Sequence, residues 1–314
     1  MHIFLSVTCI ILGILMENFI LTPCLTSRST AMVIDFRVRP PLKGFEKMSI
    51  LGPQKGFELF PFNYEDTEEV ESARKMSMPL FFKEMEEAGI DMGVVLPRNT
   101  AIGWGGVSND EVAAGVAEYP DKLIGFGAVD VSGGIRQAVE EAEHAVVDLG
   151  LKGIVVEPGC MKPALYPDAN RLYPVYDRCA ELGVPVVVSQ SMLLGPDMSY
   201  AQPECVQRAA HDFPTCTFII AHAGYPWVEA AAAVACVTEN VYLIPDLYMN
   251  MERVPGSDMF ARGIHFTHGK RFLFGSAYPV RGMKQSMKEI QRFRLPDTLY
   301  KKFTYENAAE ILGL

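Results

Sequence analysis

The sequence lacks several features that would place it in a well-defined class of protein. Its seven cysteines include no C-x-x-C pair, which argues against a structural zinc site or a disulfide framework and favours reduced thiols of a cytoplasmic protein. The glycine-rich turns G-x-G-x-x-G and G-x-x-x-x-G-K-[ST] are also missing. Positive charge is scarce: 28 Lys and Arg against 38 Asp and Glu give a net charge of −10. This balance argues against a nucleic-acid-binding protein but not against a local basic pocket for a small anion.

Long apolar runs are scarce as well. The run IFLSVTCIILGILM at 3–16 is shorter than the roughly 18 residues of a membrane-spanning helix. No Lys or Arg precedes it, and no clear A-x-A site follows it. We therefore interpret residues 1–31 as an N-terminal apolar extension, from a misassigned start in preference to a signal-like segment. No linker divides the remaining residues, so we expect one domain over 32–314 with no stable membrane span.

After Met32, short apolar runs alternate with longer amphipathic segments. The runs are rich in Val and Ile and continuously apolar, which is typical of a parallel sheet covered on both faces. Eight such strands in about 280 residues predict a (β/α)8 TIM barrel, with an open doubly wound sheet as the alternative. The expected strands are 33–38, 92–97, 123–129, 153–157, 184–189, 217–222, 241–246 and 271–276. The expected helices are 74–88, 109–118, 134–148, 172–182, 203–212, 226–238 and 282–293.

Polar side chains follow nearly every expected strand. In a TIM barrel the active site lies at the carboxyl ends of the strands, so these residues are the candidates for a site. Strand 33–38 is unusual because Asp35, Arg37 and Arg39 stand at every second position in and just after it, and alternate residues share one face of a strand. The candidates in chain order are Asp35, Arg37, Arg39, Arg98, Asn99, Asp130, Glu157, Ser189, Gln190, His222, Asp246, Ser276, Tyr278 and Arg281.

Four segments, in this order along the chain, resemble the amidohydrolase-related barrels, a family with decarboxylases of aminocarboxymuconate-semialdehyde type, hydratases and lactonases. RLYPVYDRCAELGVPVVVS (171–189) is similar to the approach to the fifth strand of that family, and IIAHAGYPWVEAA (219–231) to its sixth strand and following helix. RFLFGSAYP (271–279) resembles the F-G-[ST]-D-Y-P segment, and YENAAEILGL (305–314) resembles the closing helix. The resemblance runs from about residue 32 to 314 and also implies a TIM barrel.

The resemblance implies a metal site that this sequence has altered. The family binds its metal through H-x-H on strand 1, His on strands 5 and 6, and Asp on strand 8. At those positions stand Arg37-Val38-Arg39, Ser189, His222 and Ala277. A guanidinium stays protonated and does not ligate a metal, and catalytic zinc needs three protein ligands. We therefore predict no metal and no cofactor.

Two arginines that face into the mouth of a barrel need negatively charged partners, because burying an unpaired charge is costly. One interpretation is an internal ion-pair network in which acidic residues neutralise Arg37, Arg39 and Arg98. The other is an anion site, because arginine forms two-point contacts with carboxylates. We predict that these three arginines bind a small carboxylated substrate.

His222 is the candidate general base, since it follows a strand. Glu157 and Asp246 are candidates for acid–base work or for orienting His222, and each is equally a candidate arginine partner. Tyr278 is a candidate hydrogen-bond donor to substrate, with ordinary packing as its alternative. The glycine-rich segment LPRNTAIGWGG (96–106) is either a mobile loop or a plain turn.

Three functions remain open from the sequence, and we prefer the first. The first is a metal-independent hydrolase acting on a lactone or a similar bond of a small carboxylated molecule. The second is a carboxy-lyase of the same family, and the third is a barrel that binds an anion without turnover. Barrels of this kind often pair, so we also expect a homo-oligomer.

Overall fold

A computed structural model describes residues 32–51, 69–100 and 103–314 of the chain. The extension predicted over 1–31 lies outside these residues, so its boundary and its role stay predictions. Within the described ranges, every helix is too short or too polar to cross a membrane.

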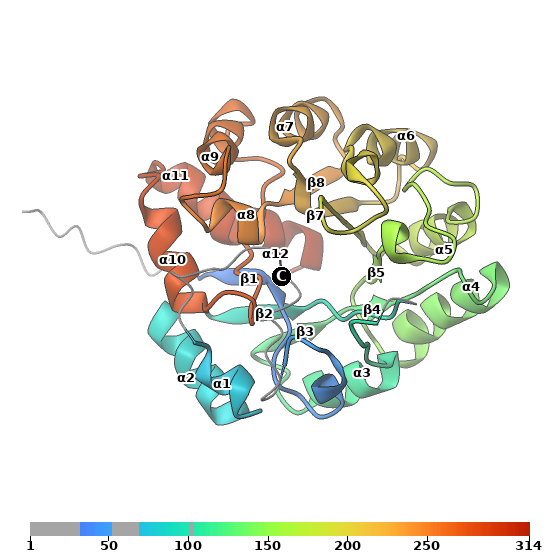
Figure 1. Cartoon of the computed structure of the whole chain (residues 1–314), viewed down its shortest axis with the longest axis horizontal. Helices are drawn as coiled ribbons and strands as arrows, with labels where there is room; N and C mark the ends of the chain where they lie inside the picture. Colours follow the sequence, from blue (N-terminus) through green and yellow to red (C-terminus); the bar gives the residue numbers. More distant parts are fainter. Residues whose placement is uncertain (1–31, 52–68, 101–102) are drawn as a thin grey trace, which may run out of the picture. The chain divides into compact units, whose positions relative to one another are not determined.

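The strands form two parallel sheets in the orders β1-β2-β3 and β4-β5-β6-β7-β8 (Figure 1). They are β1 Ile34–Val38, β2 Met92–Val95, β3 Leu123–Gly125, β4 Gly127–Ala128, β5 Ile154–Val156, β6 Val186–Ser191, β7 Phe218–Tyr225 and β8 Val241–Ile244. β3 and β4 belong to one predicted strand. Phe126 between them donates its N–H to the carbonyl of Val95 (3.1 Å), whereas Gly127 donates to Gly153 (2.8 Å). The segment thus changes partner from β2 to β5 and joins the two sheets.

The predicted eighth strand closes the barrel, although it pairs through isolated bridges. On one side, Leu243 of β8 donates to the carbonyl of Arg271 (2.7 Å), and on the other, Phe36 of β1 donates to Phe274 (2.8 Å). Segment 271–278 therefore lies between β8 and β1. The TIM-barrel prediction is confirmed.

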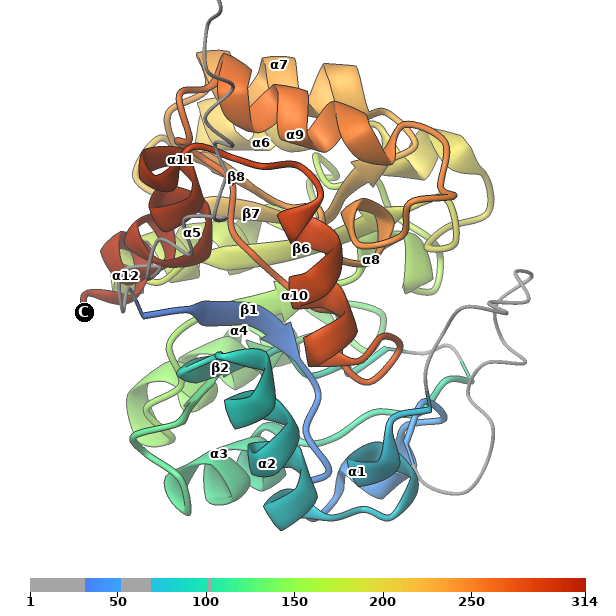
Figure 2. The same cartoon turned by 90° about the vertical axis from the view of Figure 1, so that its left-hand side faces the viewer.

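The helices cover the outside of the strands, and α2 packs beside α10 next to β1 (Figure 2). Gly183, at φ 67°, ends α5 as its position in the sequence predicts. The helix predicted over 74–88 is wrong at its start, because Ser77 caps a new helix by accepting the N–H of Leu80 (3.4 Å). The helices are α1 Glu71–Arg74, α2 Met78–Ala88, α3 Asn109–Ala117, α4 Ile135–Glu143, α5 Tyr173–Leu182, α6 Glu204–Asp212, α7 Val228–Val237, α8 Asp246–Met249, α9 Ser257–Phe266, α10 Met283–Gln291, α11 Asp297–Lys301 and α12 Asn307–Leu312.

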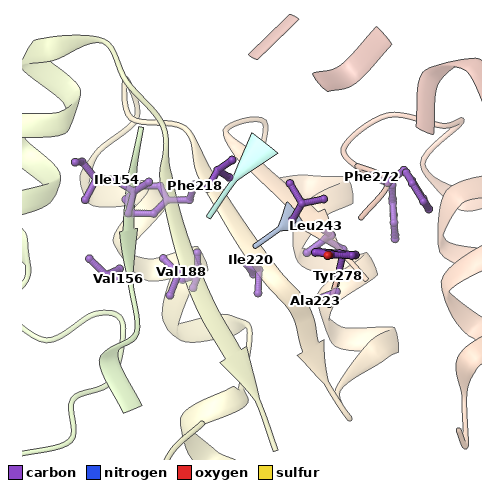
Figure 3. Packing of buried hydrophobic residues seen from close by; sticks show 14 of the residues in the cluster. Ile154, Val156, Val188, Phe218, Ile220, Ala223, Leu243, Phe272 and Tyr278 are labelled. Carbon is purple, nitrogen blue, oxygen red and sulfur yellow. The ribbon is translucent and has the colours of Figure 1, made fainter. Parts of the chain in front are cut away.

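Buried side chains alternate between two layers. In β7, Phe218 and Ile220 pack outward with the helices, whereas Ile219 and Ala221 join the interior of the barrel. Figure 3 shows outward residues of neighbouring strands in one layer. Ala308 of α12 packs at the end where the strands begin. The strands are therefore apolar on both faces, and the polar residues gather where they end.

Candidate functional site

A pocket opens where the strands end, and most of its lining comes from residues that follow strands. It encloses about 510 Å³, open solvent included. Polar and cationic groups lie on one part of the lining, and aliphatic side chains complete it. The lining residues are Arg37, Arg39, Ile50, Arg98, Trp104, Ser191, Leu193, Leu194, His222, Leu247, Tyr248, Ala277 and Val280.

β1 departs from the strict alternation that the sequence predicts. The register of its pairing with β2 shifts between Asp35 and Val38. Ile34 and Phe36 pack inside the barrel, and yet Arg37 and Arg39 line the pocket. Strict alternation would place Asp35 on the same face as Arg37 and Arg39. Instead, the two arginines line the pocket and Asp35 does not. A β-bulge re-aims side chains in this way and is frequent beside active sites.

Arg37 is buried and only partly paired. Its side chain is 5% exposed, and Nη1 lies 3.5 Å from Oδ2 of Asp246. Its Nε has no hydrogen-bond partner among the residues that the structure describes. A buried guanidinium with a single long ion pair retains donors for a further anion.

Arg39 and Arg98 share the carboxylate of Glu157. Arg98 holds it with two hydrogen bonds, Nε to Oε2 (2.7 Å) and Nη2 to Oε1 (3.0 Å). Arg39 lies 3.9 Å from the same carboxylate and donates Nε to the carbonyl of Leu96 (2.9 Å). Burial alone would raise the pKa of Glu157, but the charge and hydrogen bonds of Arg98, with the charge of Arg39, hold it below its usual range. Glu157 is thus placed as an arginine partner.

Three cations lie close together in this pocket. Burial, and then the charges of Arg37 and Arg98, lower the pKa of Arg39. Glu157 and Asp246 supply two negative charges against the three guanidinium groups. Because the ring of His222 is neutral, the three guanidinium groups exceed the two carboxylates by one positive charge, which favours an anionic ligand.

His222 and Asp246 form a tightly held pair. Nδ1 of His222 lies 2.9 Å from Oδ1 of Asp246, and the backbone N–H of His222 donates to Oδ2 (3.1 Å). Burial and the charge of Arg37 lower the pKa of His222, so the ring is neutral at pH 7. Burial opposes ionisation of Asp246, but His222 and Arg37 hold its pKa below the usual range. Nδ1 therefore carries the proton and donates, and Nε2 is the acceptor nitrogen.

The backbone at the site is strained. His222 (φ 65°), Asp246 (φ 33°) and Ala277 (φ 65°) all adopt positive φ, which L residues rarely do. Such strain persists only where the surrounding structure holds it, and it concentrates at functional sites. Gly275 lies in the same region, where a Cβ atom would be 3.1 Å from Cβ of Arg37.

Tyr278 does not line the pocket, so its predicted role in substrate binding needs correction. Its hydroxyl lies 2.6 Å from Oγ of Ser72, and its ring packs edge-on against Phe81 with centroids 5.0 Å apart. Figure 3 shows Tyr278 among the buried hydrophobic residues. Ser276, two residues earlier, accepts the backbone N–H of Tyr278 at Oγ (3.0 Å) and donates its own N–H to Asp35 (2.9 Å).

Two aromatic residues of the site were not predicted to bind a ligand: Tyr248, which sequence reasoning missed, and Trp104, which it considered only as part of the segment 96–106. Tyr248 in α8 stacks on Tyr225 (centroids 4.1 Å apart) and meets the ring of His222 edge-on. Trp104 packs over the guanidinium of Arg98, 4.7 Å from its ring centroid. The glycines around Trp104 were the feature that pointed to this segment. Nothing in the sequence near Tyr248 indicates that its side chain lines the pocket.

The residues present do not fit the metal site of the related barrels. Arg37 and Arg39 stand where the family resemblance implies two histidines, and both are protonated donors. Ala277 offers no ligand, and His222 is already hydrogen-bonded to Asp246. Among residues 32–51, 69–100 and 103–314, no group of three or more His, Cys, Asp and Glu side chains is arranged to hold a metal ion.

Known proteins resemble this chain over most of its length. A TIM-barrel protein of Bordetella bronchiseptica, itself uncharacterised, is 33% identical, with a TM-score of 0.83 over 90% of this chain and 98% of that one. The 2,6-dihydroxybenzoate decarboxylase of Rhizobium shares the fold, with 16% identity and a TM-score of 0.64 over 90% and 98% of the two chains.

A curated relative matches over a shorter region. The 2-amino-3-carboxymuconate-6-semialdehyde decarboxylase of Dictyostelium discoideum is 28% identical over 89 residues, which are 28% of this chain and 24% of the relative. The match thus spans about a quarter of the length of that protein. The amidohydrolase family profile matches residues 56–314. The chain belongs to the amidohydrolase family.

Proposed function

We propose that this protein is a metal-independent carboxy-lyase that acts on a small carboxylated substrate. The observation that carries the proposal is the buried guanidinium of Arg37, which has only a 3.5 Å ion pair and an unpartnered Nε among the described residues. An anion that accepts from Arg37 would satisfy these donors. The names of the decarboxylases of Rhizobium and Dictyostelium discoideum favour the lyase over the hydrolase that the sequence alone suggested.

The site residues supply the steps that decarboxylation requires. When the bond to the carboxylate carbon breaks, CO2 leaves and its electron pair stays on the substrate. A neighbouring substrate oxygen receives that charge, because it is a carbonyl once the hydroxyl proton has moved to the carbon that bears the carboxylate, and Arg37 and Arg39 stabilise the resulting oxyanion. Nε2 of His222 accepts a proton from the substrate hydroxyl and returns it to the carbon, while Asp246 stabilises the charged ring.

The apolar lining supports the release of CO2. Leu193, Leu247 and Val280 border the same pocket as the arginines. A carboxylate placed against them loses hydration, whereas the neutral CO2 does not need it. In the reacting substrate, Arg37 and Arg39 are therefore assigned to the oxyanion rather than to the departing carboxylate, which they would hold back. A simple carboxylic acid that lacks this second oxygen binds to the same arginines through its only anionic group.

Hydrolysis is the second candidate, because one observation favours it. The pair of His222 and Asp246 leaves Nε2 as an acceptor, which is the arrangement that activates a water molecule. The same arginines would then stabilise the oxyanion of a lactone carbonyl. Lactone opening and CO2 release are separable reactions, so one assay set distinguishes the two candidates.

The test measures CO2 release from 2-hydroxybenzoates and carboxymuconate semialdehydes, and ring opening of carboxylated lactones. The wild type is compared with Arg37→Met, Arg37→Lys and the control Arg136→Met, whose arginine is exposed on α4. We expect CO2 release that Arg37→Met lowers at least tenfold and that Arg136→Met leaves unchanged. Melting temperatures identify variants that fail to fold. Lactone opening without CO2 release would support the hydrolase, and carboxylate binding without turnover would support a non-catalytic barrel.

A further inference from the structure

Trp104 borders the pocket but has no part in the chemistry above. Its ring lies over the guanidinium of Arg98, whose carbon is 4.7 Å from the ring centroid. Arg98 is itself fixed by two hydrogen bonds to Glu157. A cation–π contact on a desolvated, immobilised guanidinium is stronger than an exposed one. The ion pair at the pocket wall thus also determines where the indole lies.

The backbone of Trp104 is held as firmly as its ring. Its carbonyl accepts from the N–H (3.0 Å) and the Oγ (3.1 Å) of Ser49. At Gly105, which has φ +75°, a Cβ atom would be 1.9 Å from the carbonyl oxygen of Lys47. At Gly106 it would be 2.7 Å from the carbonyl oxygen of Arg98. Residues 104–106 therefore pack against the backbone at Lys47 and at Arg98, which favours a fixed wall over a mobile loop for these residues. Residues 101–102 of the predicted loop lie outside the described residues.

The remaining lining does not discriminate by shape. Leu193, Leu194 and Leu247 are aliphatic, so they accept flat and puckered ligands alike. Tyr248 also lines the pocket, but its ring is already stacked on Tyr225 and in contact with His222. Trp104 thus presents a large, fixed aromatic surface beside the cations that bind the carboxylate.

We propose that Trp104, positioned by Arg98, is a specificity-determining residue that selects flat, unsaturated carboxylates over puckered, saturated ones of equal charge. This inference rests on the proposed carboxylate pocket. Arg37 and Arg39 recognise the charge, which is the same in both classes. A flat π-system can stack on the indole and gain an aromatic–aromatic interaction that a puckered ring cannot form. This interaction corresponds to an affinity about threefold to tenfold higher for the flat acid.

The test uses benzoate and cyclohexanecarboxylate, two acids with the same charge and a six-membered ring. Their dissociation constants are measured by calorimetry for the wild type and for Trp104→Leu, Trp104→Phe and Trp227→Phe. Trp227 is the matched control, since it lies at the start of α7 and does not line the pocket. We expect the wild type and Trp227→Phe to prefer benzoate by at least threefold. Trp104→Leu abolishes the preference with little change for cyclohexanecarboxylate, and Trp104→Phe restores part of it.

Arg98→Lys tests the positioning role. Lysine keeps the positive charge, but its ammonium group is not a planar fork. It therefore reproduces neither the two-point contact with Glu157 nor the flat contact with the indole. We expect the ratio of the two dissociation constants to move towards one, because this ratio reports on the position of the indole, whereas both constants respond to the charge. The melting temperature is recorded for each variant.

The outcomes separate this inference from the proposed function. If both acids bind through Arg37 but with equal affinity, or if Trp104→Leu weakens both equally, Trp104 is a structural residue and the inference is wrong. If the wild type binds neither acid, the carboxylate pocket itself is wrong, and the selectivity assigned to Trp104 fails with it.

Discussion

Asp246 holds His222 through both of its carboxylate oxygens, one on Nδ1 (2.9 Å) and one on the backbone N–H (3.1 Å). The same carboxylate lies 3.5 Å from Arg37. One buried acid thus orients the candidate base and compensates the candidate anion-binding cation. The two roles can be separated by substitution, because the first concerns proton transfer and the second concerns binding.

His222→Asn is expected to lower turnover more than tenfold, because asparagine cannot accept and return a proton as Nε2 does. Steady-state kinetics with the substrate found in the CO2 assay measure this. His265→Asn is the control, since His265 is exposed on α9. Unchanged turnover in His222→Asn would remove this residue from the mechanism.

Asp246→Asn is expected to change the affinity for the carboxylated substrate and the turnover rate in different ways. The amide removes a negative charge beside Arg37, so carboxylate binding strengthens or stays the same. Turnover falls at least tenfold, because the amide neither fixes the tautomer of His222 nor stabilises its charged form. A variant that loses binding and turnover in proportion would indicate a structural role for Asp246 instead.

Glu157→Ala is expected to destabilise the fold by about 3–5 kcal/mol, because it leaves Arg98 and Arg39 as buried cations without their partner. Urea denaturation measures the free energy of unfolding. Glu181→Ala removes an exposed ion pair with Arg178 and is expected to cost about 1 kcal/mol or less. Equal costs for the two variants would contradict the buried network.

Asp35 is expected to make stability depend on pH. Burial raises the pKa of this carboxyl from 3.8 to about 7. Between these two values the folded state binds more protons than the unfolded state, so stability falls as pH rises through this window. The loss is on the order of 4 kcal/mol. Asp35→Asn stays neutral and keeps an acceptor oxygen for the N–H groups of Arg37 and Ser276.

Denaturation of the wild type and of Asp35→Asn from pH 4 to pH 8 measures this difference. As pH rises, the free energy of unfolding of Asp35→Asn is expected to increase relative to that of the wild type. Asp258→Asn, at an exposed position on α9, is the control. Parallel stability curves for the wild type and Asp35→Asn would show that Asp35 does not titrate in this range.

Chelation is expected to leave the protein unchanged, because arginine occupies the positions where related barrels have histidine ligands. The measurements are melting temperature and CO2 release after dialysis against EDTA. Loss of activity that Mn2+ or Zn2+ restores would contradict a metal-independent site.

The sequence alone determined the order of strands and helices and the barrel, because continuous apolar runs such as the one over 217–222 are buried on both faces. It also predicted that Arg37, Arg39 and Ala277 stand where the related family has metal ligands, because the surrounding segments resemble those of that family. His222 and Asp246 were predicted at strand ends for the same reason.

Only the tertiary structure decided which charged groups pair. Glu157 binds Arg98, and Asp246 binds His222, although the sequence left both carboxylates open. Contacts between distant segments depend on side-chain direction, and a shift of register in β1 moved Asp35 off the face of Arg37. Of the two roles that the sequence left open for Tyr278, the structure favours packing, because its hydroxyl is hydrogen-bonded to Ser72 on a distant helix. A local sequence pattern indicates the periodicity of an element and which of its residues are buried. The partner of a buried polar group, in contrast, depends on the packing of the whole domain.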